Sequence, residues 1–296
     1  MKGSKIAAIL AAAIITITGA VSDIFPANRY SEPENRIIRA YAADSYTNDI
    51  KGFITRMYNV CLDKDPSDKV ISNWTAKLNS HVATGADVVV TFFNSSEYKS
   101  RGRTNAQIVS DCYNAVLGRN PDSSGAATWQ KHLDVGMTVN DMCKGLVQSS
   151  EFKTLCSAYG IQVGSVTLKN VRDENFERTY FVYRLYANCL GRYPDISGLE
   201  NWCVQLKNGY TGAKIVQGFV CSNEYKSKNT SNTEFVTMLY NTLLGRGPDA
   251  TGLNNWVAQL NSGKSRNYVI NGFLFSSEFK GQCARAGISV GTKLPE

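Results

Sequence analysis

The sequence predicts an all-α fold of four tandem three-helix repeats, arranged as two lobes and reinforced by disulfides. Three observations carry this prediction: a motif that recurs four times, helical spacing of apolar residues inside each copy, and eight cysteines that divide evenly between the two halves of the chain. Self-similarity at a fixed period is typical of repeat proteins, in which each unit buries its apolar face against its neighbours.

The recurring motif runs from a tyrosine through a Gly-Arg-x-Pro-Asp-x-x-Gly loop to a tryptophan. It reads YNAVLGRNPDSSGAATW from Tyr113, YANCLGRYPDISGLENW from Tyr186 and YNTLLGRGPDATGLNNW from Tyr240. A divergent copy, YNVCLDKDPSDKVISNW, begins at Tyr58. The copies end at Trp74, Trp129, Trp202 and Trp256. Because the spacing from tyrosine to tryptophan is constant, we expect the four segments to fold alike.

The copies form two pairs, since the gap between Tyr113 and Tyr186 is wider than the gap inside either pair. Each pair also ends alike, in Cys156 to Ile161 and in Cys283 to Ile288, each followed by x-Val-Gly. The predicted organisation is a signal peptide and processed leader (1–42), a first lobe (43–164) with repeats at about 49–101 and 104–157, a linker (165–174), and a second lobe (175–296) with repeats at about 176–229 and 231–288.

The first helix of each copy precedes the loop. Its apolar positions in the first copy are Phe53, Ile54, Met57, Tyr58, Cys61 and Leu62, and the other copies keep this register. Residues four apart share one face of an α-helix, whereas a strand would alternate. The glycine that follows in three copies tolerates the positive φ that commonly ends a helix.

The second helix starts at the Pro-Asp step, because proline cannot continue a helix and aspartate is a good N-cap. The expected N-caps are Asp122, Asp195 and Asp249. The tryptophans that follow, at 129, 202 and 256, fall on an apolar stripe, which favours core packing over stacking on a sugar.

The third helix begins at a threonine or serine that suits an N-cap and runs to a Ser-x-Glu-aromatic ending. The four expected caps are Thr84, Thr138, Thr211 and Ser265.

A guanidinium follows the loop glycine in three copies, at Arg119, Arg192 and Arg246. Such a group can bind an anionic ligand, or it can hold its own repeat together by pairing with the loop aspartate or the Ser-x-Glu carboxylate. Because the arginine recurs from unit to unit, the internal clamp is the favoured interpretation.

The cysteines are Cys61, Cys112, Cys143, Cys156, Cys189, Cys203, Cys221 and Cys283. In an exported chain an even number of cysteines predicts disulfides, and the four in each half allow three pairings. The internal symmetry favours four bridges: 61–156, 189–283, 112–143 and 203–221.

The N-terminus has the form of a secretory signal peptide. Lys2 and Lys5 precede an uncharged run from Ile6 to Ser22, which is short for a membrane span. Cleavage is expected after Ala42, which ends a small-x-small site, or alternatively after Ser22. The sequence therefore predicts a secreted or cell-surface protein, with membrane attachment only through an uncleaved N-terminal segment.

The repeats resemble the bacterial domain-of-unknown-function family 4214. Its hallmark is F-V-x-x-L-Y-x-x-L-L-G-R-x-P-D-x-x-G-L-x-x-W followed by S-x-E-F, and the fourth copy, FVTMLYNTLLGRGPDATGLNNW, follows it almost throughout. The likeness covers about residues 49–288. The first copy departs from it at Asp63, Lys64, Ser67 and Val70. The resemblance implies a secreted or surface bacterial protein and supplies no activity, cofactor or site residue.

Motifs of enzymes are scarce in this sequence. It contains no HExxH, G-x-S-x-G, P-loop or dinucleotide fingerprint, and His81 and His132 lack metal-ligand spacing. The acidic loop of the first copy, 63–68, lacks the central glycine and terminal glutamate of a calcium loop. The net charge of +7 is spread without a basic block, which does not favour nucleic acid. We expect no catalytic residue, cofactor or metal site.

The leading interpretation is a non-enzymatic interaction module, a helical-repeat scaffold for an extracellular protein or glycan. An alternative is a cell-wall or carbohydrate-binding protein that uses aromatic residues in turns, for which Tyr193 and Tyr210 are the candidates. A further alternative is a hydrolase with an unrecognised site.

Overall fold

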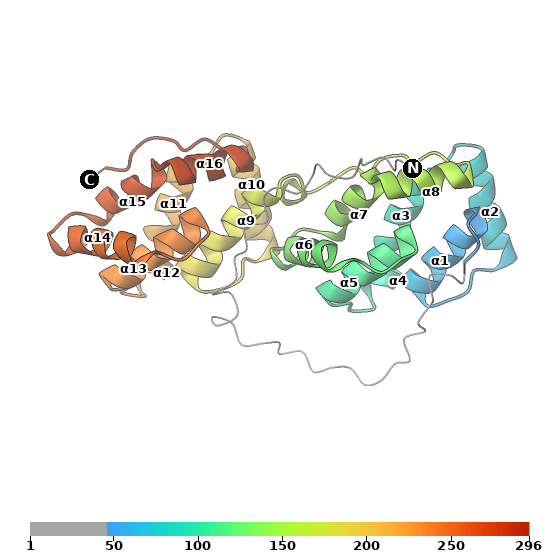
Figure 1. Ribbon diagram of the computed structural model, residues 1–296, viewed down its shortest axis with the longest axis horizontal. Coiled ribbons are helices and arrows are strands. Elements are labelled where there is room, and N and C mark those ends of the chain that lie inside the picture. Colours follow the sequence, from blue (N-terminus) through green and yellow to red (C-terminus); the bar gives the residue numbers. More distant parts are fainter. Residues whose placement is uncertain (1–45, 296) are drawn as a thin grey trace, which may run out of the picture.

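The computed structural model describes residues 46–295, and this part of the chain contains helices and no strand. Figure 1 shows two groups of helices side by side, with α6 of the first half facing α9 of the second. The predicted signal peptide and leader, residues 1–42, lie outside the described residues. No helix between 46 and 295 has both the length and the apolar character needed to cross a membrane.

The helices follow one order in every repeat. The first repeat contains α1 (Ile50–Leu62), α2 (Asp68–Asn79), α3 (Gly85–Phe93) and α4 (Ser96–Lys99). The second contains α5 (Asn105–Cys112), η2 (Tyr113–Leu117), α6 (Ser123–Asp134), α7 (Val139–Gln148) and α8 (Ser150–Tyr159). The third contains η3 (Val171–Asp173), α9 (Phe176–Arg184), η4 (Leu185–Leu190), α10 (Ile196–Lys207), α11 (Gly212–Val220) and α12 (Asn223–Lys226). The fourth contains α13 (Asn232–Leu239), η5 (Tyr240–Leu244), α14 (Ala250–Asn261), α15 (Arg266–Leu274) and α16 (Ser277–Ala286).

The prediction of three helices per repeat was wrong, because the Ser-x-Glu segment forms a fourth. Its serine stops the third helix and caps the next one: the Oγ atom of Ser149 accepts a hydrogen bond from the backbone N–H of Phe152 (3.1 Å). The same bond joins Ser276 and Phe279 (3.2 Å). This fourth helix is short in the first and third repeats and long in the second and fourth, which end the two pairs.

The predicted N-caps of the second and third helices are confirmed. The loop aspartates at 122, 195 and 249 each accept the backbone N–H of the motif glycine, at 2.9, 2.7 and 2.8 Å. Thr84, Thr138, Thr211 and Ser265 cap α3, α7, α11 and α15. The divergent loop of the first repeat keeps the same path, because Ser67 caps α2 and Asp63 adopts the positive φ (55°) of the missing glycine.

The first helix widens into a π turn just before the loop in the second, third and fourth repeats (η2, η4 and η5). In the first half, the buried Arg56 of α1 closes this turn: its Nε atom donates to the carbonyl of Ala115 at 2.9 Å and its Nη2 atom to that of Val116 at 3.3 Å. In the second half, Gln282 of α16 donates to the carbonyl of Leu244 in η5. In the first half this joins neighbouring repeats, whereas Gln282 and Leu244 belong to the same repeat, and Arg184 of α9 joins the third repeat to the fourth by donating to Gln282 at 2.7 Å.

The buried apolar side chains form two clusters, one between residues 53 and 166 and the other between 181 and 294. Each cluster is completed by the tail that follows the last helix of its pair. The backbone N–H groups of Gly85 and Ala86 donate to the carbonyls at 162 and 163, both at 2.8 Å, and those of Gly212 and Ala213 donate to the carbonyls at 289 and 290, also at 2.8 Å. The tail thus satisfies orphan donors at the start of α3 or α11, and it ties the end of each pair to its first repeat.

The segment predicted as a linker, 165–174, is packed against both halves. Asp173 is buried and accepts hydrogen bonds from the backbone N–H (2.7 Å) and the hydroxyl (2.6 Å) of Thr138 at the start of α7. Glu200 of α10 accepts the backbone N–H of Val171 at 2.7 Å. Capping hydrogen bonds therefore hold this segment on the first half and on the second.

The disulfide prediction was wrong, because all eight cysteines are free. Helix packing gives Cys61 and Cys156 different neighbours: Cys61 faces Cys143 and Asp111, whereas the sulfur of Cys156 lies beside Gly85 of α3. Cys112 and Cys143 are in contact but as thiols that share a hydrogen bond. Burial raises the pKa of Cys156, Cys189 and Cys283 to about 12 and that of Cys203 to about 11.

This arrangement predicts the thiol chemistry of the folded protein. We expect a thiol reagent such as DTNB to modify Cys221 quickly in the native state, because it is the exposed cysteine, and to reach the other seven only after unfolding. Cys221→Ser is the control and should abolish the fast phase. A total below eight thiols in denaturant without reductant would contradict the free state of the cysteines.

Candidate functional site

The Tyr-to-Glu part of the motif builds one polar network in each consensus repeat. Arg246 lies over the ring of Tyr240, with Cζ 5.2 Å from the ring centroid, and its Nε and Nη2 atoms donate to the two carboxylate oxygens of Glu278, both at 2.9 Å. The clamp interpretation predicts this arrangement, with the Ser-x-Glu carboxylate as the partner. The pKa of Arg246 is raised chiefly by its hydrogen bonds to Glu278.

The second and third repeats have the same network. The Arg119 guanidinium lies 5.1 Å over the ring of Tyr113, and its hydrogen bonds to Glu151 measure 2.6 and 2.8 Å. Arg192 lies 5.0 Å over the ring of Tyr186. Its hydrogen bonds to Glu224 measure 2.6 and 3.1 Å, and they lower the pKa of that carboxyl group. In each case a bidentate ion pair, with its guanidinium over the face of the tyrosine ring, thus joins the loop to the fourth helix.

The motif glycine provides space for the tyrosine hydroxyl. A Cβ atom at Gly125, Gly198 or Gly252 would lie 2.4, 2.6 or 2.1 Å from the hydroxyl oxygen of the tyrosine in the same repeat. Burial raises the pKa of these three tyrosines, and the indole N–H of the motif tryptophan opposes that rise. The Pro-Asp-x-x-Gly spacing therefore has two functions: the aspartate caps the helix, and the glycine leaves space for the tyrosine hydroxyl.

The four tryptophans are half-buried against the core rather than enclosed in it. Each indole of the consensus repeats lies over a glycine of the third helix: a Cβ at Gly145 would meet Trp129 at 2.3 Å, at Gly218 Trp202 at 3.9 Å, and at Gly272 Trp256 at 2.3 Å. Their packing role agrees with the sequence prediction. Their partial exposure was not predicted, because helical spacing locates a face but not the edge of the helix layer.

The first repeat keeps the ion pair in a weaker form. Lys64 stands in place of the arginine and pairs with Glu97, and both side chains are largely exposed. Val70 occupies the position of the motif glycine, so the space taken by the tyrosine hydroxyl elsewhere is filled. Tyr58 is accordingly only half-buried, whereas the three equivalent tyrosines are buried.

The ion pair predicts a measurable stability term. Arg246→Ala should reduce the free energy of unfolding by roughly 1–2 kcal/mol, the sum of a solvent-screened ion pair and a cation–π contact. The side chains of Arg246 and Glu278 are 43% and 39% exposed, which limits the ion-pair part. Chemical denaturation measures the change, with Lys280→Ala on α16 as the control for loss of a surface cation. An unchanged free energy of unfolding in Arg246→Ala would contradict the clamp.

The glycine predicts a second, independent effect. Gly252→Ala should lower stability by about 1–3 kcal/mol through overpacking against the Tyr240 hydroxyl, although alanine is the better helix former. In a Tyr240→Phe background the same substitution should cost much less, because the clashing oxygen is gone. Gly247→Ala, where a Cβ meets nothing within 4 Å, is the control in the same loop. Equal costs in both backgrounds would show that the hydroxyl is not the obstacle.

A family profile described as "Domain of unknown function (DUF4214)" matches residues 37–101, 92–156, 162–229 and 222–283. The chain belongs to the DUF4214 family. No curated protein matches its sequence. The four profile matches confirm the resemblance that the four motif copies indicate. In this chain the residues that mark a DUF4214 repeat hold that repeat together, which leaves the positions where one repeat differs from the others as candidates for a functional site.

The third DUF4214 repeat differs from the others by an aromatic strip, formed by Phe176, Tyr180, Tyr183 and Tyr193. Consecutive ring centroids along it lie 5.4, 6.3 and 5.9 Å apart. The first three residues share one face of the first helix, at i, i+4 and i+7. The sequence interpretation missed this spacing, although the letters F-x-x-x-Y-x-x-Y contain it.

The inner end of the aromatic strip contacts the first half of the chain. The His132 ring of α6 stacks on Phe176 at 4.2 Å with an interplanar angle of 10°, and the Lys131 ammonium lies 4.4 Å over the ring of Tyr180. His132 also pairs with Asp141 at 2.7 Å. These contacts join α6 of the first half to α9 of the second, so the strip connects the halves as well as facing outward.

The outer end of the aromatic strip faces solvent. Tyr193 is 57% exposed and Ile196, at the start of α10, is 68% exposed. Tyr193 contacts Tyr183, and this contact adds to the effect of burial in raising the pKa of Tyr183. The other sequence candidate, Tyr210, packs against Trp202 at 5.8 Å beneath the Lys214 ammonium. The structure therefore does not bring the two candidate tyrosines into one contact.

The described residues contain no group of three or more histidine, cysteine, aspartate or glutamate side chains placed to hold a metal ion. In the acidic loop of the first repeat, Asp65 accepts a hydrogen bond from Asn59 at 2.7 Å and Lys64 pairs with Glu97, so both are used within the loop and its neighbours. What the arrangement around 176–196 offers is a firmly held aromatic and aliphatic surface.

Proposed function

We propose that this chain is a non-enzymatic interaction module, secreted or held at the cell surface, whose helical repeats present a rigid surface to an extracellular protein. The observation that carries the proposal is the exposed end of the aromatic strip, Tyr193 and Ile196. The large hydrophobic residues that are most exposed within 46–295 are these two and Val82. Exposed apolar side chains that gather at one place are typical of interaction sites, and tyrosine is enriched there.

The comparison among repeats supports this location. The positions equivalent to Tyr193 are Asp65, Asn120 and Gly247, and those equivalent to Ile196 are Asp68, Ser123 and Ala250. The same loop backbone thus carries small or polar side chains in three repeats and two large apolar ones in the third. Since the loop folds equally well without them, their contribution to folding does not account for them.

Rigidity also supports a binding role. The side of the strip facing α6 is fixed by His132 and Lys131, and Thr138 holds the preceding segment through Asp173. A surface that is already ordered loses less conformational entropy when a partner docks. We propose that each half works as one lobe and that the strip keeps the two lobes in a fixed relation.

Export is part of the same proposal and rests on the sequence of the N-terminal segment, with Lys2 and Lys5 before an uncharged run. Free thiols are compatible with an oxidising compartment here, because seven of the eight cysteines are buried. Burial separates those thiols from oxidants in solution and from the thiols of other protein molecules.

A glycan is the second candidate partner, and one observation favours it. The ring of Tyr193 is held by Tyr183 and is more than half exposed, which is the arrangement that stacks on the apolar face of a sugar ring. The ligand would then be a cell-wall polysaccharide, and Tyr193 would be the central residue of the binding site.

Tyr193→Ala tests both candidates. We expect the free energy of unfolding to stay within about 0.5 kcal/mol of the parent, because the side chain is mostly exposed, and binding to fall at least tenfold. Retention is measured on two matrices: purified cell-wall sacculi, and envelope proteins freed of glycan. Asn120→Ala, at the same loop position in the second repeat, is the matched control.

Loss of retention on sacculi alone assigns a glycan, and loss on proteins alone assigns a protein. Undiminished binding of Tyr193→Ala to both matrices would refute the assignment of this loop as the contact surface.

A further inference from the structure

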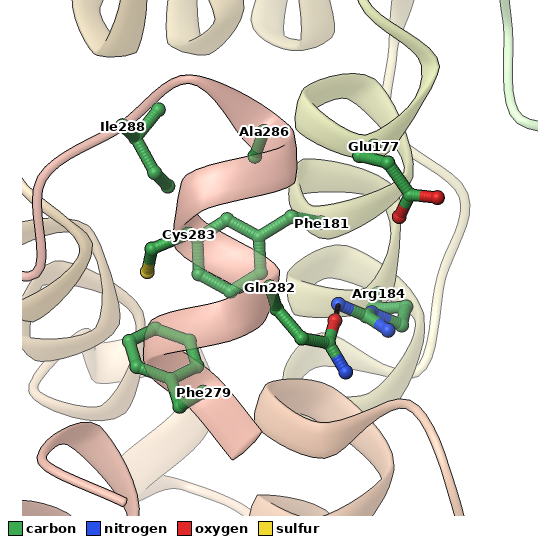
Figure 2. A pocket seen from close by; sticks show the side chains of 8 residues that line it. All are labelled: Glu177, Phe181, Arg184, Phe279, Gln282, Cys283, Ala286 and Ile288. Atoms are coloured by element: carbon green, nitrogen blue, oxygen red, sulfur yellow. Dashed lines mark hydrogen bonds between the residues drawn. The ribbon is translucent and has the colours of Figure 1, made fainter. Parts of the chain in front are cut away.

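Two cations lie over one ring of the aromatic strip. The Lys131 ammonium is 4.4 Å from the ring centroid of Tyr180, and the Cζ atom of Arg184 is 4.8 Å from the same centroid. Arg184 is buried, and it donates a hydrogen bond of 2.7 Å to the Oε1 atom of Gln282 in α16 (Figure 2). Lys131 is exposed and also lies 5.3 Å over Phe176. The strip therefore carries one accessible positive charge, with a second cation buried near it.

The ammonium of Lys131 has no direct ion partner among residues 46–295. Partial burial of the side chain lowers the pKa of Lys131, and repulsion from Arg184 adds to this effect. The Glu177 carboxylate acts on both cations in the opposite direction, but it forms no ion pair with either within the described part of the chain. A carboxylate that approached Lys131 from solvent would stabilise its charged form.

The consensus repeats show what completes such a contact. In each of them a cation over a tyrosine ring also binds a carboxylate, as Arg246 does with Tyr240 and Glu278. At Tyr180 the ring and the accessible cation are present without that third group. A carboxylate supplied by a partner would complete the same arrangement.

Three other lysines also lie over aromatic rings, but each contacts a ring within four positions of it along the chain. They are Lys77, Lys214 and Lys264. Lys131 differs from them because it reaches from α6 to rings of α9 and lies on the strip that ends in Tyr193 and Ile196. A cation and an exposed apolar surface are thus combined on one strip.

The spacing of the rings determines which segment fits. The centroid of Tyr183 lies 6.3 Å from that of Tyr180 and 5.9 Å from that of Tyr193. An extended chain advances about 3.3–3.6 Å per residue. A carboxylate at Lys131 and an apolar side chain at Tyr193 would therefore come from residues at most about four positions apart.

We propose that the aromatic strip binds an extended acidic segment of a protein partner, with a glutamate or aspartate side chain at Lys131 and a nearby apolar side chain on Tyr193 and Ile196. The inference rests on the proposed function, because it takes the strip to be a contact surface and the partner to be a protein. It adds the chemistry by which that partner is recognised.

The test uses a peptide with a single charge, acetyl-Phe-Ser-Ser-Glu-amide, and its glutamine analogue. At low ionic strength we expect the glutamate peptide to shift the NMR amide signals of the full chain around Lys131, Tyr180 and Tyr193, with a Kd on the order of 1 mM. The glutamine analogue should bind at least fivefold more weakly. Salt should reduce this difference, because it screens exposed charges.

Lys131→Gln should remove the preference for the glutamate peptide, and Lys131→Arg should keep it. Comparing the two peptides on each variant separates the contact between the charges from a general loosening of the strip. Lys264→Gln is the matched control, because it removes a lysine that lies over the Tyr268 ring in the fourth repeat. It should leave the preference unchanged.

Equal binding of the two peptides to the parent chain, absence of shifts with both, or a glutamate preference that persists in Lys131→Gln would each overturn the inference. Shifts of the same signals with methyl glucuronide but with neither peptide would overturn it in favour of an acidic glycan. If the glutamate preference is absent while Tyr193→Ala still loses retention on envelope proteins, the inference is wrong and the proposed function is supported. A glutamate preference together with undiminished retention of Tyr193→Ala would refute the proposed function alone.

Discussion

The loop of each consensus repeat is held by the bidentate ion pair between its arginine and the Ser-x-Glu carboxylate, formed over the face of the motif tyrosine. In the fourth repeat Arg246, Tyr240 and Glu278 bring together residues from the loop, the first helix and the fourth. The tyrosine hydroxyl in turn requires Gly252, and the same loop turn begins the second helix at Asp249. Each of these contacts lies inside one repeat, so the path of the loop is specified by residues of that repeat.

Pairing of repeats uses different chemistry. A buried arginine, Arg56, satisfies carbonyls of a π turn in the next repeat, and a tail after the last helix caps the third helix of the first. Both devices supply partners for backbone groups that a helix leaves unpaired. The two pairs copy this plan but fill it differently at two places, where Ala286 replaces Tyr159 and where the third repeat adds its aromatic strip. Binding is proposed at the aromatic strip because the shared residues are already engaged in holding the repeats together.

The cysteines show how helix packing overrides an argument from symmetry. Matching positions in the two halves suggested end-to-end bridges such as Cys61 to Cys156. A helix directs each side chain to a particular layer, however, and Cys61 meets Cys143 while Cys156 meets the start of α3. Equivalence in sequence told which cysteines share an environment, and it could not tell which share a contact. The aromatic strip shows the opposite situation. Its i, i+4, i+7 spacing is visible in the sequence, but only the position of α6 beside Phe176 shows what the strip contacts.

The sequence by itself determined the number of repeats, their helical character and the N-caps, and it favoured an internal clamp for the loop arginine, because each of these features is local or recurs from copy to copy. Periodicity, proline and capping residues act within a few positions of one another. Because the motif is repeated, substitutions in a single copy do not hide it. Only the tertiary structure decided the state of the thiols, the tail that closes each pair and the exposure of Tyr193. Those outcomes depend on which side chains, distant in sequence, come into contact. Local sequence patterns do not contain this information.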